Sequence, residues 1–301
     1  MEKIKEISIN NSLYPKLLKK IPDPPKILYI RGKILPSPPH QNFGVGASED
    51  CFAIVGTRMC SSYGKQVALE IAGDLAEAGL TIVSGLAPGI DTFCHQATLE
   101  RKKRTIAVLG TGLDEKSIYP QSNLKLAEKI VESGGCLISE YPSGTSGSRF
   151  TFPKRNRIIA GLSLGVLVIE AKQKSGALIT ANWAKKQNRK IFAVPGPIYS
   201  SNSRGCHCLI RQGAKLVETA NDILKELNLS LKITRPAILA AGETPEENSI
   251  LDALKEEGLY IDKIIEKTKL PTAKVVSTLA VLEIKGKIRN LGNNIYAINN
   301  R

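Results

Sequence analysis

Residues 150–161 combine more chemically active side chains than any other stretch of the sequence, in the order FTFPKRNRIIAG. Pro153 stiffens the start of a predicted short helix, and Lys154, Arg155 and Arg157 then crowd its first turn. Cations at a helix N-terminus oppose the helix dipole, so stability alone does not favour this placement. A bound anion would relieve the conflict, and these side chains suit phosphate oxygens. The alternative is that Lys154 and Arg157 pair with acidic residues elsewhere in the chain.

Two aromatic residues, Phe150 and Phe152, precede these cations in the sequence. Asn156 lies between the cations Arg155 and Arg157. Proteins that bind single strands stack nucleobases on aromatic rings next to cations, so the two rings are a candidate stacking surface. The alternative for either ring is ordinary packing in the core. Trp183, in a helical stretch over residues 180–187, is expected to be a core-facing aromatic residue.

The elements that must position these residues follow from the hydrophobic pattern. From residue 51 onwards, short apolar runs alternate with amphipathic stretches of helical period. The predicted strands are 52–55, 80–83, 105–109, 136–138, 165–169, 190–194 and 214–217, and the predicted helices are 65–78, 92–101, 123–133, 156–162, 177–187 and 220–227. Near-continuous apolar strands separated by helices indicate a parallel sheet covered on both faces. The sequence therefore predicts an α/β fold, a doubly wound sheet of the Rossmann type.

Small and polar residues follow several of the predicted strands. Ligands of doubly wound sheets bind outside the carboxyl ends of the strands, where backbone N–H groups and helix N-termini attract oxyanions. Arg58 adds a fork of donors that suits phosphate. The candidate phosphate ligands at this edge are Gly56, Arg58, Ser84, Gly85, Ser175 and Gly176. Ordinary turn chemistry is the alternative for any single Ser-Gly pair.

Enzymatic chemistry has weaker support. Neither GxGxxG at the first turn nor GxxxxGK[ST] occurs, so NAD and P-loop nucleotide sites lose their main evidence, and no cofactor is predicted. Asp91 and His95 have the i, i+4 spacing that could orient an acid–base histidine, although a capping aspartate is the commoner explanation. Glu140 and Glu170 both follow strands and could form a carboxylate pair, but nothing in the sequence assigns them catalytic roles.

The charge is concentrated in one region. The 301 residues carry 42 Lys and Arg against 28 Asp and Glu, a net charge of +14. Residues 149–215 hold thirteen Lys and Arg and one acid, Glu170, a net charge of +12. Such an excess points to a polyanion as partner, bound at the predicted phosphate edge.

Other features set the class of protein. No run of about 18 apolar residues and no apolar leader occurs, so a cytoplasmic protein without membrane contact is expected. Six Cys in such a chain argue for reduced thiols. Cys206 and Cys208 flank His207, but no second ligand cluster exists, so no metal site is predicted and these are expected to be buried or half-buried thiols.

The pattern predicts a proline-rich lead-in over residues 1–50 that packs on the next domain, a Rossmann-like domain over 51–227, a linker over 228–246 and a small domain over 247–301. The last has three predicted helices (247–257, 262–267 and 272–284) and a Gly-Asn hairpin, which together describe a winged helix. Its first half is acidic, whereas the third helix and wing carry Lys274, Lys285, Lys287 and Arg289, a secondary candidate nucleic-acid surface.

Many of these motifs occur together and in order in one known family. Residues 55–58 (VGTR), 84–91 (SGLAPGID), 139–142 (SEYP), 152–161 (FPKRNRIIAG), 175–181 (SGALITA) and 194–196 (VPG) make the chain similar to the DprA/Smf family of bacterial DNA-processing proteins. The resemblance covers about residues 14–227, and the winged helix resembles the usual C-terminal module of that family.

The resemblance implies an extended Rossmann domain that binds and protects incoming single-stranded DNA without catalysis. It further implies a homodimer that helps to load the RecA recombinase during natural transformation. The DNA-binding residues of the family, carried onto matching positions, include Arg58, Ser84, Gly85, Lys154, Arg155, Asn156, Ser175 and Gly176. Two alternatives remain from the residues themselves: an enzyme that acts on a nucleotide phosphate at the same edge, and a duplex-binding regulator that uses its winged helix.

Overall fold

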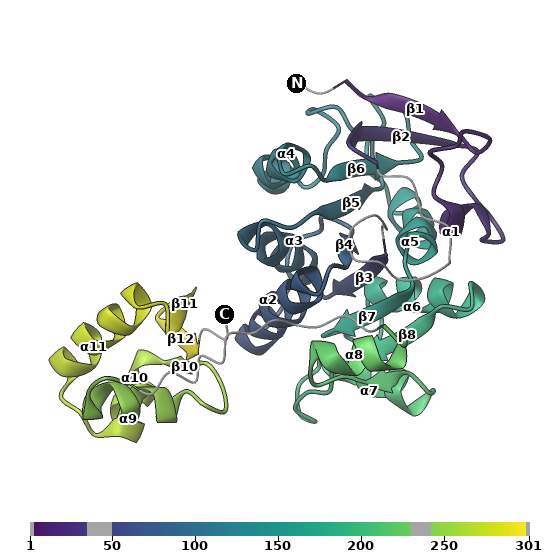
Figure 1. The fold of residues 1–301 in the computed structure, drawn as a ribbon. Helices are drawn as coiled ribbons and strands as arrows, with labels where there is room; N and C mark the ends of the chain where they lie inside the picture. The colour runs from purple at the N-terminus through teal and green to yellow at the C-terminus, as the bar shows by residue number, and fades with distance from the viewer. Residues whose placement is uncertain (1–2, 35–49, 230–241, 299–301) are drawn as a thin grey trace. The chain divides into compact units, whose positions relative to one another are not determined.

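The computed structural model describes residues 3–34, 50–229 and 242–298 (Figure 1). The chain divides into a larger part, residues 1–60 and 71–233, and a smaller part, residues 234–301 together with 61–70. The two parts are described separately. The predicted proline-rich stretch 36–39 and residues 230–241 of the predicted linker lie outside the described residues. The domain boundaries at 50/51, 227/228 and 246/247 stay predictions.

The larger part is built on one nine-stranded sheet. Its strands are β1 (Lys5–Ser8), β2 (Ile27–Gly32), β3 (Cys51–Gly56), β4 (Thr81–Ser84), β5 (Thr105–Leu109), β6 (Cys136–Ser139), β7 (Gly165–Ile169), β8 (Lys190–Ala193) and β9 (Lys215–Leu216). Their order is β1-β2-β6-β5-β4-β3-β7-β8-β9. The pairs β1–β2 and β2–β6 are antiparallel and all others are parallel, which confirms the predicted mostly parallel sheet.

The direction of winding reverses between β3 and β7. After β3 the chain moves outward through β4, β5 and β6, and α5 (Thr151–Leu162) then returns it to β7, which pairs with β3 in parallel. The next strands, β8 and β9, continue outward on the other side. Loops diverge at such a reversal, so the carboxyl ends of β3 and β7 are where this architecture places a ligand.

Helices cover both faces of the sheet (Figure 1). They are α1 (Lys16–Lys19), α2 (Ser62–Glu77), α3 (Ile90–Glu100), α4 (Leu124–Glu132) after a short 3-10 turn η1 (Gln121–Asn123), α5, α6 (Gly176–Lys186), α7 (Arg204–Arg211) and α8 (Ala220–Glu226). One core cluster joins α4 to β5 and β6, and a second joins α1, α5 and α6 to the opposite face. Among the described helices, none combines the length and the apolar character that a bilayer crossing requires.

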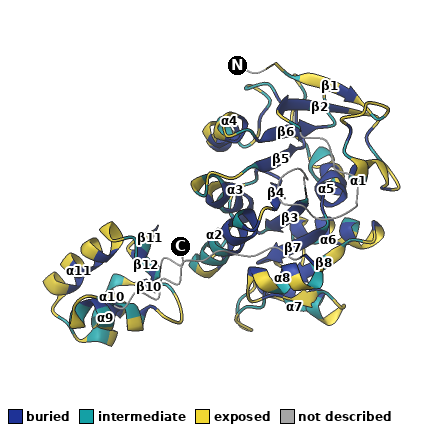
Figure 2. Ribbon diagram, viewed as in Figure 1, coloured by how far each residue is buried: buried dark blue, intermediate teal, exposed yellow. Residues whose placement is uncertain are grey.

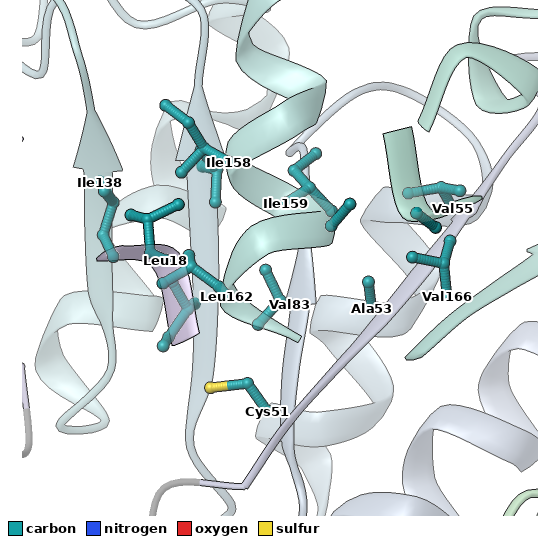
Figure 3. Close-up of a cluster of buried hydrophobic side chains, with 14 of the residues drawn as sticks. Leu18, Cys51, Ala53, Val55, Val83, Ile138, Ile158, Ile159, Leu162 and Val166 are labelled. Carbon is teal, nitrogen blue, oxygen red and sulfur yellow. The ribbon is translucent and has the colours of Figure 1, made fainter. Parts of the chain in front are cut away.

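The core positions α5, which carries the basic segment. Ile158 and Leu162 of α5 pack with Leu18 of α1 and Val83 of β4 in one buried cluster (Figure 3). A Cβ at Gly161 would come within 2.8 Å of Leu18 Cδ1, so glycine at this position permits the close approach of α1 to α5. Figure 2 shows the central strands of the sheet buried and the outer faces of the helices exposed. Because α5 is fixed along its apolar face, its polar side chains hold defined positions at the strand ends.

The smaller part has its own core. Its elements are α9 (Pro245–Ala253), β10 (Leu259–Tyr260), α10 (Ile261–Thr268), α11 (Thr272–Ile284), β11 (Ile288–Gly292) and β12 (Ile295–Ile298). The buried side chains come from all three helices and from β11, with the sheet order β10-β12-β11. Asn293 and Asn294 have positive φ values of 54° and 57° in the β11–β12 turn, as a tight hairpin turn requires. These are the elements of a winged helix, with the hairpin as the wing.

Candidate nucleic-acid interface

A pocket opens at the carboxyl ends of β3 and β7, where the sheet reverses. We call it the strand-end pocket; it has a volume of about 360 Å³. Of the residues predicted from the sequence, the lining includes Gly56, Arg58, Arg155, Asn156, Ser175 and Gly176. Elements far apart in sequence therefore meet here as the pattern of strand ends predicts. The volume falls within the range of roughly 300–1,000 Å³ that is usual for ligand pockets.

Positive charge lines one side of the strand-end pocket. Arg58 follows β3, and Lys172 and Lys174 stand in the loop that follows β7; all three residues are exposed. None of the three forms an ion pair with a carboxylate in the described part of the chain. Lys172 and Lys174 were not predicted as individual ligands, although both lie in the same strand-end loop as Ser175 and Gly176.

The first turn of α6 adds backbone donors to this side. Ser175 is its N-cap, and the Ser175 hydroxyl accepts a hydrogen bond from the backbone N–H of Ala177 at 3.3 Å. The N-terminal end of an eleven-residue helix thus faces the pocket with its partial positive charge. Gly176 has no atom within 4 Å of the place where a Cβ would lie, so its backbone is open to a ligand.

Arg155 forms the floor of the strand-end pocket. It is 5% exposed, and its guanidinium donates to the backbone carbonyls of Val108 and of Gly85, the latter at 2.9 Å. Asp91 accepts the Gly85 N–H at 3.0 Å from the other side. Burial lowers the pKa of Arg155 to about 10, so Arg155 stays cationic at neutral pH, whereas burial raises the pKa of Asp91 against the opposing charge of Arg155. Arg155 therefore holds the loop after β4 in place while contributing charge to the pocket.

Ser84 and Gly85 lie beneath the pocket and do not line it. Ser84 is fully buried, and its hydroxyl donates to the carbonyl of Ile54 at 2.6 Å. The Gly85 backbone is occupied by Asp91 and Arg155, as described above. Asn156, by contrast, donates to the Gly176 carbonyl at 3.3 Å and so links α5 to the start of α6. The small residues after β4 fix the loop, and the residues after β3 and β7 face the ligand space.

The three cations of α5 have different environments. The helix begins at Thr151, five residues before the predicted start, so Pro153 is its third residue and Lys154 its fourth. Arg157 is 1% exposed; its Nη2 donates to Glu140 Oε1 at 2.5 Å and its Nε to Asp23 Oδ2 at 2.8 Å. Lys154 is half-exposed and its Nζ lies 3.6 Å from Glu140 Oε2. The structure thus gives both Lys154 and Arg157 the ion pair with an acidic residue that was the alternative for them, in each case with Glu140. Helical spacing turns position 157 toward the core, so Arg157 is buried, whereas about half of the Lys154 side chain stays exposed.

The aromatic residues of this segment lie at the surface. Phe150 is 70% exposed, with the Arg149 guanidinium 4.8 Å from its ring centroid, so core packing is wrong as an explanation for this residue. Phe152 lines the strand-end pocket, where its ring lies 5.6 Å from that of Tyr119 and 5.8 Å from the Arg58 guanidinium carbon. Aromatic faces therefore accompany the cations, as a site for unpaired bases requires.

The basic segment 149–215 does not form one surface. Lys190 Nζ contacts Glu226 Oε1 at 2.7 Å, and Lys215 Nζ lies 3.9 Å from Glu226 Oε2. Arg189 donates to the carbonyls of Leu17 and Gly161 at 3.2 and 3.4 Å. Arg189 thus bonds within the domain, and Lys190 and Lys215 lie at the opposite ends of β8 and β9. The charge available at the strand ends comes instead from Arg58, Lys154, Lys172 and Lys174, together with the buried Arg155.

Three of the residues considered for catalysis, Asp91, His95 and Glu140, have structural roles. His95 is fully buried; its Nδ1 lies 2.8 Å from Thr105 Oγ1, and burial lowers the pKa of His95 to about 3. Asp91 accepts backbone N–H groups rather than orienting His95, and Glu140 neutralises Arg157. Within residues 3–34, 50–229 and 242–298, no group of three His, Cys, Asp or Glu side chains could hold a metal ion. Cys206 is buried and Cys208 half-buried.

The cations of the winged helix are largely paired. Lys285 Nζ contacts Glu243 Oε2 at 2.8 Å and Glu247 Oε1 at 2.7 Å, and Lys287 Nζ lies 3.8 Å from Glu247 Oε2. Lys274 on α11 lies 3.3 Å from Glu246. The acidic first half of this part thus neutralises several cations of the second half. Arg289 lies on β11, the first strand of the wing.

The fold and the site define a class of protein. A Rossmann-type sheet presents cations, aromatic rings and a helix N-terminus at its reversal point, without a nucleotide fingerprint, and a winged helix follows it in the sequence. This combination is that of an α/β protein with a candidate anion site at the sheet reversal and an appended winged helix.

Comparison with known proteins identifies the family. The profile of the family "DNA recombination-mediator protein A" matches residues 5–228, and that of the "DprA winged helix domain" matches residues 234–294, which confirms the predicted winged helix. The chain belongs to the DNA recombination-mediator protein A family, the DprA/Smf family that the motifs indicate.

Relatives and solved structures agree with this assignment. The chain is 37% identical to Protein Smf of Escherichia coli over 289 residues, which are 94% of this chain and 74% of that protein. The X-ray structure of DprA from Streptococcus pneumoniae is 42% identical, covers 74% of each chain and superposes with a TM-score of 0.65. DNA processing protein A from Helicobacter pylori, described with a single-stranded DNA binding mode, is 29% identical, covers 76% of this chain and 98% of its own, and has a TM-score of 0.62.

Proposed function

We propose that this chain is a single-stranded DNA-binding protein that acts on incoming DNA in transformation and catalyses no reaction on it. The observation that carries the proposal is the strand-end pocket, where Arg58, Lys172 and Lys174 have no described carboxylate partner and face the N-terminus of α6. Cations of this kind neutralise backbone phosphates, and the neighbouring Phe152 ring suits an unpaired base. The single-stranded DNA binding mode described for the Helicobacter pylori relative supports the same function.

The proposed site divides its residues by role. Arg58, Lys154, Lys172 and Lys174 contact phosphates with their side chains, and Gly56 and Gly176 offer backbone N–H groups. The Ser175 N–H donates to the Lys172 carbonyl at 3.0 Å, so Ser175 shapes the loop and caps α6. Arg155, Asn156, Ser84 and Gly85 shape the floor and the loop after β4. Arg157 keeps α5 in position. The winged-helix cations Lys274, Lys285, Lys287 and Arg289 form at most a secondary surface, because all four pair with glutamates.

The proposal extends to partners. We infer that the protein works in the cytoplasm as a homodimer and helps to place the RecA recombinase on the bound strand; membership of the DNA recombination-mediator protein A family supports this. Sedimentation of the protein alone tests the dimer. Co-sedimentation of RecA with protein-coated single strands tests the delivery step, and recruitment no faster than on bare DNA contradicts it.

One binding experiment separates the proposed function from its alternatives. Single-stranded DNA, duplex DNA and RNA of one length are titrated with the protein and with the variants Arg58→Ala, Lys154→Ala and Lys125→Ala. Lys125 is an exposed residue of α4 that lines no described pocket and serves as the charge-matched control. We expect preference for single-stranded DNA, and weaker binding only for the first two variants. Tighter binding to one duplex sequence would instead favour a regulator, and nucleotide turnover lost in Glu140→Gln would favour an enzyme.

A further inference from the structure

A second hollow, separate from the strand-end pocket, lies between α5 and α6. We call it the Trp183 hollow; it has a volume of about 410 Å³ and is lined by Pro153 and Lys154 of α5 and by Ile179, Asn182, Trp183 and Lys186 of α6. None of its lining residues is acidic, although Lys154 Nζ lies 3.6 Å from Glu140 Oε2, outside the lining. The hollow therefore presents two cations, one amide and one aromatic ring.

Trp183 is placed differently from the core-facing residue that the sequence predicts. It is half-buried and packs against the main core cluster with part of its surface, while it also lines the hollow. The Lys186 Nζ lies 5.0 Å from its ring centroid. Lys186 is exposed on a flexible four-carbon stem, so it can leave the ring for a phosphate without disturbing the core. An indole fixed on one side and accessible on the other, with a mobile cation beside it, is suited to stacking on a base.

The Trp183 hollow and the strand-end pocket are neighbours. Pro153 and Ile179 line both, one from α5 and one from α6. A polymer that leaves the strand-end pocket across these two apolar side chains reaches Lys154, Trp183 and Lys186 next. Alternation of cations with exposed aromatic and apolar surface along a continuous path is the arrangement by which proteins hold a strand of unpaired nucleotides.

We propose that the Trp183 hollow is a second nucleotide subsite, in which an unpaired base stacks on Trp183 while Lys154 and Lys186 contact the flanking phosphates. The proposal rests on the proposed function, since it extends the path of the same strand along the α5–α6 groove. It assigns a direct DNA contact to Trp183, which lies in the second half of α6 and is the only tryptophan of the chain.

That single tryptophan provides the test. Tryptophan fluorescence, excited at a wavelength that tyrosine does not absorb, reports on Trp183 alone, because the chain has no other tryptophan. The parent protein is titrated with an oligothymidylate of about 16 nucleotides, the upper end of the footprint of one single-strand binding module. Tryptophan fluorescence and the anisotropy of a label on the DNA are followed together. We expect quenching that saturates in step with the anisotropy, because a stacked base quenches the indole.

Variants give an independent readout. We expect Trp183→Leu to weaken binding roughly 5- to 150-fold, the range that loss of one base–aromatic stack implies, and Trp183→Phe to recover most of the affinity. Lys186→Gln should weaken binding, whereas Lys185→Gln, an exposed neighbour on α6 that lines neither hollow, should not. If Trp183→Leu fails to fold, the comparison of Lys186→Gln with Lys185→Gln still tests the subsite.

The outcomes for the two proposals are distinct. The second subsite is overturned if the parent binds single strands normally without a change in tryptophan fluorescence, Trp183→Leu keeps the parent affinity, and the two lysine variants bind alike. The proposed function stays intact in that case. Absence of any single-strand binding by the parent overturns the proposed function itself.

Discussion

Replacing Arg157 with Met tests whether adjacent cations of α5 have separate roles. Met keeps an unbranched apolar side chain of similar length but removes the guanidinium that contacts Glu140 at 2.5 Å and Asp23 at 2.8 Å. The Asp23 side chain is 63% exposed and regains water, so this contact contributes about 0–1 kcal/mol. Glu140 is only 18% exposed, so its carboxylate is left poorly solvated and without its main partner.

The expected loss of stability follows from this geometry. Removal of one member of a buried ion pair costs about 3–5 kcal/mol, and partial exposure of Glu140 places this case near 3 kcal/mol. For a domain of this size, each kcal/mol lowers Tm by roughly 2–4 °C, so we expect a fall of about 6–12 °C. The double variant Arg157→Met/Glu140→Gln should recover part of this loss, because the unpaired carboxylate is then absent.

Thermal unfolding measures the stability, and single-strand binding is measured well below the transition. Arg157→Met should bind DNA within about twofold of the parent, whereas Lys154→Met should lose affinity with a stability change within about 0.5 kcal/mol. If Arg157→Met unfolds at the parent temperature but loses DNA binding, then Arg157 contacts the strand and the division of roles is wrong.

Further predictions concern buried groups and glycines of the larger part. His95 stays neutral when folded because burial lowers its pKa to about 3, but it gains a proton in the unfolded chain below about pH 6.5, so stability falls as the pH drops below that value. Between pH 7 and pH 5, His95 alone should lower the free energy of unfolding, measured with urea, by about 2 kcal/mol. Over the same pH interval, the unfolding free energy of His95→Gln should fall by about 2 kcal/mol less than that of the parent. Gly176→Ala should fold like the parent, since its Cβ meets no atom within 4 Å, yet weaken DNA binding by obstructing the open N-terminus of α6. Gly56→Ala should instead be strongly destabilised, because its Cβ would lie 2.0 Å from the Ile169 carbonyl oxygen.

Two outcomes would contradict these predictions. Equal loss of stability with falling pH in the parent and in His95→Gln would show that His95 is not a buried neutral group. Parent-like DNA affinity of folded Gly176→Ala would show that no ligand approaches the first turn of α6.

The sheet was predictable because its signals are local. Parallel strands buried on both faces give continuous apolar runs, and β5 and β7 have the predicted bounds. The short elements α1 and β1 and the eight-residue α7 were not predicted. Four-residue elements carry too little periodicity, and α7 contains Gly205 and two cysteines that weaken a helical pattern. Their structure depends on contacts with the rest of the domain.

The edge of the sheet that carries the site was predictable from the sequence, but the contacts of the individual side chains were not. Strand ends of one sheet must converge, so Gly56, Arg58, Ser175 and Gly176 were found from the sequence. Whether a cation faces solvent or the core depends on helix phase, and an α5 that starts at Thr151 turns Arg157 inward. Trp183 shows the same limit, because an apolar pattern does not distinguish a buried ring from a half-buried one that lines a hollow.

The salt dependence of single-strand binding tests most directly whether Arg58 and Lys154 neutralise phosphates of the bound strand. If Arg58 and Lys154 each neutralise a phosphate, the slope of log K against log salt should lose about 0.7 per contact, and the Arg58→Ala/Lys154→Ala variant about 1.4 in total. We expect this flattening together with weaker binding at low salt, while Arg157→Met retains the parent slope. A double variant with the affinity and slope of the parent at every salt concentration would contradict the account.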